Sequence, residues 1–187
     1  MVILIGGVSH AGKTLMAQQL LEKYKYPYLS IDHLKMGLYR ANIGCGFTPL
    51  DSTEDIGEKL WPVLKGIIMT NIENNQNIII EGCYVLPQKV NELDNDYLKS
   101  IISIYIGFSQ EYVKKHFQTK ILRHQCAIES RGHEDNNTLE EYMLMNKKQK
   151  MLYQNNNVKY FEIVTNYQDE ISQAYAWIDN ELIRRLL

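Results

Sequence analysis

The chain has few cysteines, no excess of charge of either sign and no long apolar run. Its three cysteines, Cys45, Cys83 and Cys126, lie far apart and form no CxxC pair, which argues against a disulfide framework or a zinc site and favours a reducing compartment. Twenty Lys and Arg residues against 22 Asp and Glu residues give a formal net charge of −2, so no global field steers the molecule toward nucleic acid or an anionic membrane. No stretch is long enough to span a bilayer.

The amino terminus also lacks the features of a secretory signal. Its apolar run covers only residues 2–5, with no basic segment before it and no small-residue cleavage site after it. We therefore expect a cytoplasmic protein. The chain has 187 residues, of which 45% are hydrophobic, and it contains no linker or internal repeat, so we expect one domain over residues 1–187.

Short apolar runs alternate with helical patterns along the chain. Runs typical of buried strands are found at residues 1–5, 28–31, 77–81, 101–106 and 158–164. Helical patterns follow the first run and then occupy residues 32–40, 52–72, 87–93, 110–122, 139–153 and 168–186. The third of these patterns opens with a capping-box pair, Ser52 and Asp55, and contains Pro62, which predicts a kink or a break. The alternation predicts an α/β fold of three layers, with helices on both faces of a five-stranded parallel sheet.

A glycine-rich loop joins the first strand to the first helix. It fits the pattern G-x-x-x-x-G-K-[ST] and reads Gly7-Val8-Ser9-His10-Ala11-Gly12-Lys13-Thr14. Glycines let backbone amides turn inward onto phosphate oxygens, and the helix that follows adds its positive N-terminal end. Lys13 supplies a cation for the β- and γ-phosphates, and the Thr14 hydroxyl is a ligand for Mg²⁺. We predict a site for ATP and Mg²⁺ that continues to Leu15; GTP in place of ATP, or a tight turn that binds nothing, are the alternatives.

Two acids stand at the carboxyl ends of predicted strands, where ligands bind in parallel sheets of this kind. Asp32 follows the second strand and is the candidate for accepting the proton of an incoming hydroxyl or anchoring that hydroxyl. Glu81, followed by Gly82, ends the third strand and is the candidate for holding a Mg²⁺-bound water or the acceptor. The alternatives are that Asp32 only caps a helix, and that Glu81 only accepts hydrogen bonds from the next loop.

A local excess of basic residues lies between residues 114 and 133. Arg123 and Arg131 fall where the helical pattern gives way to a polar segment, so we expect a lid at about residues 122–137 that brings an arginine over the triphosphate. The alternative is a solvated charged face. RNA binding is disfavoured, because the segment lacks interleaved aromatic residues for base stacking.

These features together resemble the nucleoside- and metabolite-kinase branch of P-loop proteins, over nearly the whole chain. The resemblance implies the adenylate-kinase-like fold, with strand order 2-3-1-4-5 and a helical lid. The segment GGVSHAGKT with the later LSIDHL is similar to the chloramphenicol phosphotransferase and zeta-toxin group, which implies that Asp32 activates the acceptor hydroxyl. The segment IEGCYVLP is similar to 2-phosphoglycerate kinases, which implies that Glu81 and Gly82 belong to the acceptor side.

The resemblance also implies two further binding regions. Arg40, on the helix after Asp32, would face the acceptor pocket, with a surface ion pair as the alternative. The adenine would lie between Arg131 and the loop at residues 165–167. We therefore expect a kinase that transfers the γ-phosphoryl group of ATP to a small-molecule acceptor, as a monomer or homodimer, without nucleic acid or membrane partners. A nucleoside or nucleotide monophosphate kinase, a regulatory ATP-binding module and a toxin acting on a cell-wall sugar nucleotide are the alternatives.

Overall fold

The computed structural model describes residues 1–41, 44–124 and 137–186. Five parallel strands form one sheet: β1 (Val2–Gly7), β2 (Tyr28–Ser30), β3 (Ile78–Glu81), β4 (Ile101–Phe108) and β5 (Tyr160–Ile163). The α-helices are α1 (Lys13–Tyr24), α2 (Ile31–Arg40), α3 (Thr53–Glu73), α4 (Pro87–Val90), α5 (Asn95–Leu98), α6 (Gln110–His116), α7 (Leu139–Asn155) and α8 (Tyr167–Leu186).

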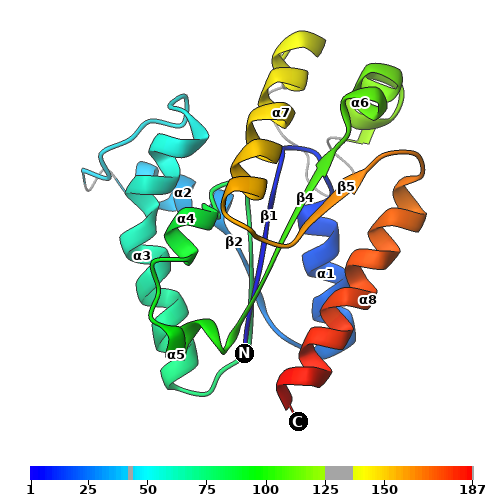
Figure 1. The fold of residues 1–187 in the computed structure, drawn as a ribbon. Coiled ribbons are helices and arrows are strands. Elements are labelled where there is room, and N and C mark those ends of the chain that lie inside the picture. The colour runs from blue at the N-terminus through cyan, green and yellow to red at the C-terminus, as the bar shows by residue number, and fades with distance from the viewer. Residues whose placement is uncertain (42–43, 125–136, 187) are drawn as a thin grey trace.

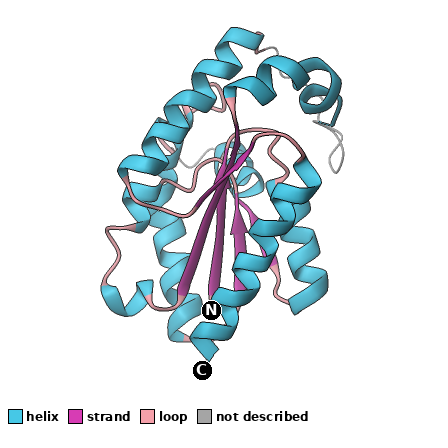
Figure 2. Ribbon diagram, turned by 45° about the vertical axis from the view of Figure 1, so that its right-hand side comes forward, coloured by secondary structure: helices cyan, strands magenta, loops and turns pink. Residues whose placement is uncertain are grey.

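The sheet has the order β2-β3-β1-β4-β5, which confirms the predicted topology. The strand β1 lies at its centre, paired in parallel with β3 on one side and β4 on the other. Helices α1 and α8 lie on one side of the sheet, and α3, α4 and α5 on the other, so the molecule has three layers (Figures 1 and 2). This arrangement brings the loops after all five strands to one edge of the sheet.

Alternate side chains of β1 belong to two separate apolar cores. Ile3 and Ile5 pack in a cluster that also contains residues of α1 and α8, whereas Val2 and Leu4 pack in a cluster with residues of α3. All six residues of β1 are buried, as expected of a central strand covered on both faces. The apolar runs of the sequence therefore mark strands that have a core on each side.

The structure differs from the predicted helices in three places. Helix α3 begins at its Ser52 cap as predicted and runs unbroken through Pro62, so of the predicted kink or break the break is wrong. The expected α-helix over residues 110–122 is α-helical only to His116 and continues as a π-helical turn over Phe117–Ile121. The expected helix at 87–93 ends at Val90. In the part of the chain that is described, no helix has both the length and the hydropathy of a membrane crossing.

Candidate active site

A cavity of about 530 Å³ lies at the carboxyl edge of the sheet. The glycine-rich loop forms its centre, and the loops after the other strands form its two ends. After β2 and β3 come Asp32, Lys35, Glu81, Cys83 and Tyr84, joined by Thr53 of α3; after β4 and β5 come Phe108, Tyr112, Lys120, Ile121, Asn166, Tyr167 and Gln168. The sheet order therefore separates an acidic end from an aromatic end, with the loop between them.

The loop needs glycine at two positions for reasons that the structure shows directly. Gly7 has a φ of +136°, and a Cβ atom there would lie 2.1 Å from the carbonyl oxygen of Ile106 on the neighbouring strand. Gly12 has a φ of +83°, and a Cβ atom there would lie 2.0 Å from the hydroxyl oxygen of Tyr167. Left-handed backbone and lack of space both exclude larger residues, so the two glycines set the path of the loop.

Two tyrosines from the last third of the chain hold the loop carbonyls. The hydroxyl of Tyr142 on α7 donates to the carbonyl oxygen of Ser9 at 2.6 Å, and the hydroxyl of Tyr167 on α8 donates to that of Ala11 at 3.2 Å. The ring of His10 also stacks on Tyr142, with 6.3 Å between ring centroids. Both carbonyl oxygens are therefore bonded to side chains outside the loop, and within the loop the amide of Ala11 donates to the carbonyl oxygen of Val8 at 3.4 Å.

The loop lysine is buried and already engaged. Lys13 is 8% exposed, and its ammonium donates to the carbonyl oxygen of Val8 at 2.8 Å. Ser9, His10, Gly12, Thr14 and Leu15 line the cavity with it, whereas Gly7, Val8 and Ala11 of the loop are buried and do not line it. A cation and the start of α1 therefore face the same space, which is the arrangement that a polyphosphate requires.

Glu81 is a buried carboxylate on the floor of the cavity. It is 1% exposed, its strand position lies opposite Ser30 and Ile5, and its Oε1 atom has no hydrogen-bond partner within the described residues. Burial raises the pKa of Glu81, although the nearby charge of Lys13 opposes the shift. An unpartnered buried carboxylate oxygen is costly in the free protein, and it fits a bound group that brings donors or a cation.

Asp32 belongs to a hydrogen-bonded chain that the sequence reasoning missed. Lys35, one turn further along α2, donates to Oδ1 of Asp32 at 3.0 Å and to the hydroxyl of Tyr84 at 2.7 Å. Burial alone would lower the pKa of Lys35, but the bond to Tyr84 and the charge of Asp32 outweigh it, and the net shift is upward. Burial also raises the pKa of Tyr84 to about 12, so the hydroxyl stays protonated. The ammonium thus holds the Asp32 carboxylate in one place.

The ion pair of Lys35 with Asp32 could have been predicted from their spacing, because residues three apart share a helix face. The contact of Lys35 with Tyr84 spans 49 residues and the contact of Tyr142 with Ser9 spans 133, and neither has a local sequence pattern. Tyr112 and Lys120, which line the aromatic end, were also missed.

The two predicted arginines within the described residues do not line the cavity. Arg40 and Arg123 are exposed, and neither lines it. Arg131 and most of the predicted lid at 122–137 lie outside the described residues; residues 122–124 form a short 3-10 turn. Gly82 lies directly after Glu81, where a Cβ atom would be 2.9 Å from the Cβ of Ile31. The structure therefore brings together the loop, Asp32 and Glu81.

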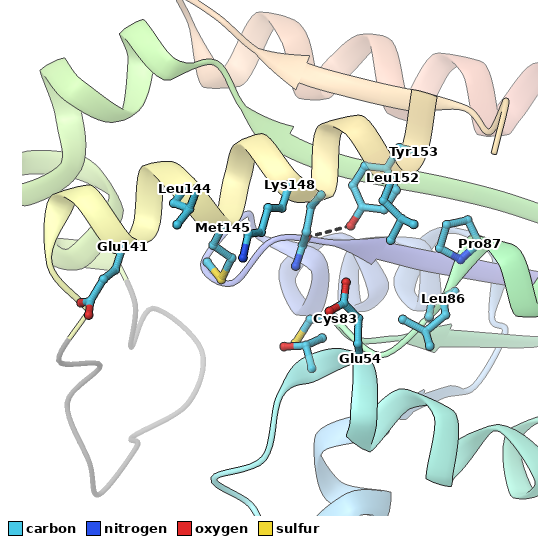
Figure 3. A pocket seen from close by; sticks show the side chains of 13 residues that line it. Glu54, Cys83, Leu86, Pro87, Glu141, Leu144, Met145, Lys148, Leu152 and Tyr153 are labelled. Atoms are coloured by element: carbon cyan, nitrogen blue, oxygen red, sulfur yellow. Dashed lines mark hydrogen bonds between the residues drawn. The ribbon is translucent and has the colours of Figure 1, made fainter. Parts of the chain in front are cut away.

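A second, smaller cavity adjoins the first. We call it the distal cleft; it measures about 250 Å³ and is lined by Thr53, Glu54, Cys83, Val85, Leu86, Pro87, Glu141, Leu144, Met145, Lys148, Gln149, Leu152 and Tyr153. Thr53 and Cys83 line both cavities. Figure 3 shows the cleft between α7 and the segment that follows β3.

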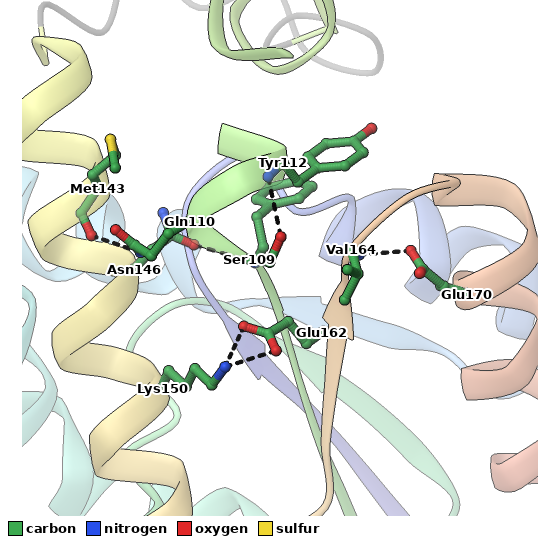
Figure 4. Close-up of polar contacts among 10 residues, drawn as sticks. Ser109, Gln110, Tyr112, Met143, Asn146, Lys150, Glu162, Val164 and Glu170 are labelled. Carbon is green, nitrogen blue, oxygen red and sulfur yellow. Dashed lines mark hydrogen bonds and ion pairs between the residues drawn. The ribbon is translucent and has the colours of Figure 1, made fainter. Parts of the chain in front are cut away.

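Helix α7, which forms one wall of this cleft, is fastened to the carboxyl ends of β4 and β5 (Figure 4). The side chain of Asn146 accepts from the backbone amide of Phe108 at 3.2 Å, and Lys150 binds both carboxylate oxygens of Glu162 at 2.7 Å. Gln110 of α6 donates to the carbonyl oxygen of Met143 at 3.1 Å. These bonds fix α7 beside the site.

No protein-family model matches the sequence, and no curated protein is detectably related to it. Solved structures do share its fold. A shikimate kinase from Bacteroides thetaiotaomicron matches with a TM-score of 0.59 at 13% identity, over 96% of this chain and 98% of that one. A shikimate kinase from Acinetobacter baumannii, in complex with shikimate, matches with a TM-score of 0.57 at 19% identity, over 96% and 92%.

A gluconokinase from Sinorhizobium meliloti matches with a TM-score of 0.50 at 13% identity, over 98% of this chain and 91% of that one. These matches extend over nearly the full length of each chain, so they concern the whole fold rather than the glycine-rich loop alone. With the sheet order and the loop described above, they lead to one conclusion. This chain has the fold of the P-loop small-molecule kinases.

Proposed function

We propose that this protein transfers the γ-phosphoryl group of ATP to a hydroxyl group of a small-molecule acceptor. The observation that carries the proposal is one cavity that contains a phosphate-binding loop with its lysine, and two carboxylates on one side of that loop. Phosphoryl transfer needs positioning and charge neutralisation more than covalent chemistry, and these groups supply both. The fold shared with small-molecule kinases supports the proposal.

In this proposal the loop amides and Lys13 bind the β- and γ-phosphates. Asp32 accepts the proton of the acceptor hydroxyl while the hydroxyl oxygen bonds to the γ-phosphorus. The bond between the γ-phosphorus and the β–γ bridging oxygen breaks, and ADP leaves. Lys35 and Tyr84 orient Asp32 for that step. The aromatic end, with Tyr112 and Lys120, receives the nucleotide base.

Thr14 and Glu81 fit a magnesium ion. Both line the cavity, and Oε1 of Glu81 is buried without a partner in the described part of the chain. The described residues contain no cluster of three His, Cys, Asp or Glu side chains that would hold a metal by themselves. A magnesium ion suits such a site, because it takes most of its ligands from phosphates and water. When bound, it neutralises charge on the phosphates during transfer.

Labelled ATP, Mg²⁺ and pools of hydroxylated metabolites test the proposal. The wild-type protein should label at least one acceptor, Lys13→Ala should abolish transfer without unfolding, and Asp32→Asn should reduce transfer by at least about 100-fold. Lys147→Ala and Asp169→Asn are matched controls, because both residues are exposed and line neither cavity. ATP binding without any labelled product would favour a regulatory module, and Asp32→Asn with full transfer would remove Asp32 from its role.

A further inference from the structure

The distal cleft opens from one end of the main cavity only. It shares Thr53 and Cys83 with that cavity, and both residues belong to the acidic end. Cys83 lies next to Tyr84, which binds Lys35 and through it Asp32. The aromatic end follows β4 and β5, on the other side of the loop. A molecule that occupies both cavities therefore extends away from the acceptor position rather than from the nucleotide.

The walls of the cleft are apolar along most of their length. Leu86 and Pro87 lie on the side of the segment after β3, and Leu144, Met145 and Leu152 lie along α7 (Figure 3). Leu144 is 54% exposed in the free protein. Exposed apolar side chains that line a cavity are typical of binding sites for apolar groups.

The charged groups of the cleft do not favour an ionic occupant. Glu54 and Lys148 bring one charge of each sign. Glu141 closes the capping box of α7, where its carboxylate accepts from the backbone amide and the hydroxyl of Thr138 at 2.8 and 2.9 Å. Gln149 accepts from the hydroxyl of Tyr153 at 2.8 Å. Because Lys148 offsets one of the two carboxylates, and the other, Glu141, is bonded within the helix cap, the cleft fits a neutral group.

We propose, on the basis of the proposed function, that the acceptor is an amphipathic hydroxyl compound. Its hydroxyl group binds at Asp32, and a neutral apolar substituent of several carbon atoms fills the distal cleft between Leu86 and Leu144. A polyol or sugar without such a substituent binds at Asp32 and leaves the distal cleft empty. The cleft is then the part of the site that selects the acceptor.

Two acceptor pools of matched hydroxyl chemistry test this assignment. One contains polyols and monosaccharides of up to six carbons, and the other contains alkyl and aryl glycosides of the same sugars, nucleosides and hydroxylated aryl amides. With labelled ATP and Mg²⁺, transfer should favour the second pool by roughly tenfold or more in kcat/KM, since each extra apolar group in a pocket is worth such a factor.

Leu144→Glu and Met151→Glu form the matched pair of variants. The two residues lie two turns apart on α7 and are similarly exposed, at 54% and 53%, but only Leu144 lines the cleft. Leu144→Glu should raise the KM of the preferred acceptor roughly tenfold while kcat and the Kd for ATP stay unchanged. Met151→Glu should match the wild type, and thermal melting checks that both variants fold.

The outcomes separate the two proposals. A preference for the first pool, or a KM that Leu144→Glu leaves unchanged, would overturn the amphipathic acceptor while the kinase activity stands. Transfer to neither pool would count against the kinase activity. In that case, binding of the second-pool compounds is measured in the presence of a non-hydrolysable ATP analogue. Binding that Leu144→Glu weakens would support the cleft as a binding site. No such binding would overturn the assignment of the cleft.

Discussion

Two buried charges of opposite sign lie at the glycine-rich loop and on the strand beside it. Lys13 and Glu81 are 8% and 1% exposed, and each acts on the other through its charge. The lysine has a carbonyl partner at Val8, but Oε1 of Glu81 has none in the described residues. Buried ionised groups lower stability unless they are fully paired, so this carboxylate costs the ligand-free protein stability.

Glu81→Gln should therefore raise the stability of the ligand-free protein at neutral pH, by roughly 1 kcal/mol. Because the folded-state pKa of Glu81 lies above its ordinary value of 4.5, the unfolded chain binds fewer protons than the native protein as the pH rises past that value. The contribution of Glu81 to wild-type stability therefore falls through this range, and the variant lacks this contribution. Urea unfolding at pH 5 and pH 8 measures the difference, which should grow with pH; a constant difference would contradict the assignment.

Lys35→Met should separate positioning from nucleotide binding. Removing the ammonium releases Asp32 and Tyr84 from one another, so the carboxylate is no longer held toward the acceptor. We expect kcat to fall by about 10- to 100-fold with the Kd for ATP within about twofold of the wild type. Transfer kinetics with an identified acceptor, and calorimetry with ATP, measure the two quantities. Lys35→Arg, which keeps a cation, should recover part of kcat; equal losses in both variants would indicate a purely steric role.

At the scale of the elements, the site depends on where the helices begin. Helix α1 starts at Lys13, directly after the left-handed Gly12, and α2 starts at Ile31, so that Asp32 is in its first turn. Helix α8 starts at Tyr167, whose hydroxyl reaches the loop. The three starts converge on one space because the parallel strands before them end at the same edge.

Gly12→Ala and Gly66→Ala should act in opposite directions. The first variant places a methyl group at a φ of +83° and against the hydroxyl of Tyr167, so we expect a loss of about 1–3 kcal/mol of stability and weaker ATP binding. The second lies within α3, where a Cβ atom meets nothing within 4 Å, and should gain up to about 1 kcal/mol. Urea unfolding of both proteins checks the signs, and a stable Gly12→Ala variant with normal ATP affinity would refute the close contact.

The strands and most helices were predictable from the sequence, for physical reasons. Isoleucine-rich runs in β3 and β4 are buried on both faces and carry no competing helical period. The π-helical turn at Phe117–Ile121 could not be predicted from the sequence, because Val113, Phe117 and Ile121 have the spacing of an ordinary α-helix and all three are buried. Apart from α6, the predicted helix ends lie within three residues of the observed ones.

At the scale of the whole molecule, the sequence indicated which residues stand at strand ends but not which distant side chains meet them. The phosphate loop and the acids at positions 32 and 81 follow from local patterns. The tyrosines that hold the loop reach it across more than 100 residues, and the distal cleft joins α7 to residues at positions 53–54 and 83–87. Such contacts have no local signature, so only the folded chain shows them.

Mg²⁺ and ATP together should stabilise the entire protein. A ligand that binds only the native state at 100 times its Kd adds about 2.7 kcal/mol to the free energy of unfolding. A melting assay should therefore show a shift of several degrees with ATP and Mg²⁺, no shift with Lys13→Ala, and the wild-type shift with Lys147→Ala. A wild-type Tm that ignores both ATP and GTP would remove the basis of the kinase proposal.

The central position of β1 has a consequence for the order in which the protein matures during synthesis. The loop residues are made before the residues that fix their positions, because Gly7 lies against Ile106 and the carbonyl oxygens of Ser9 and Ala11 accept hydrogen bonds from Tyr142 and Tyr167. A nascent chain thus contains the glycine-rich loop before the residues that define the conformation of this loop have been made. If the loop binds nucleotide as proposed, it should gain its full set of contacts only after Tyr167, at the start of α8, has been made.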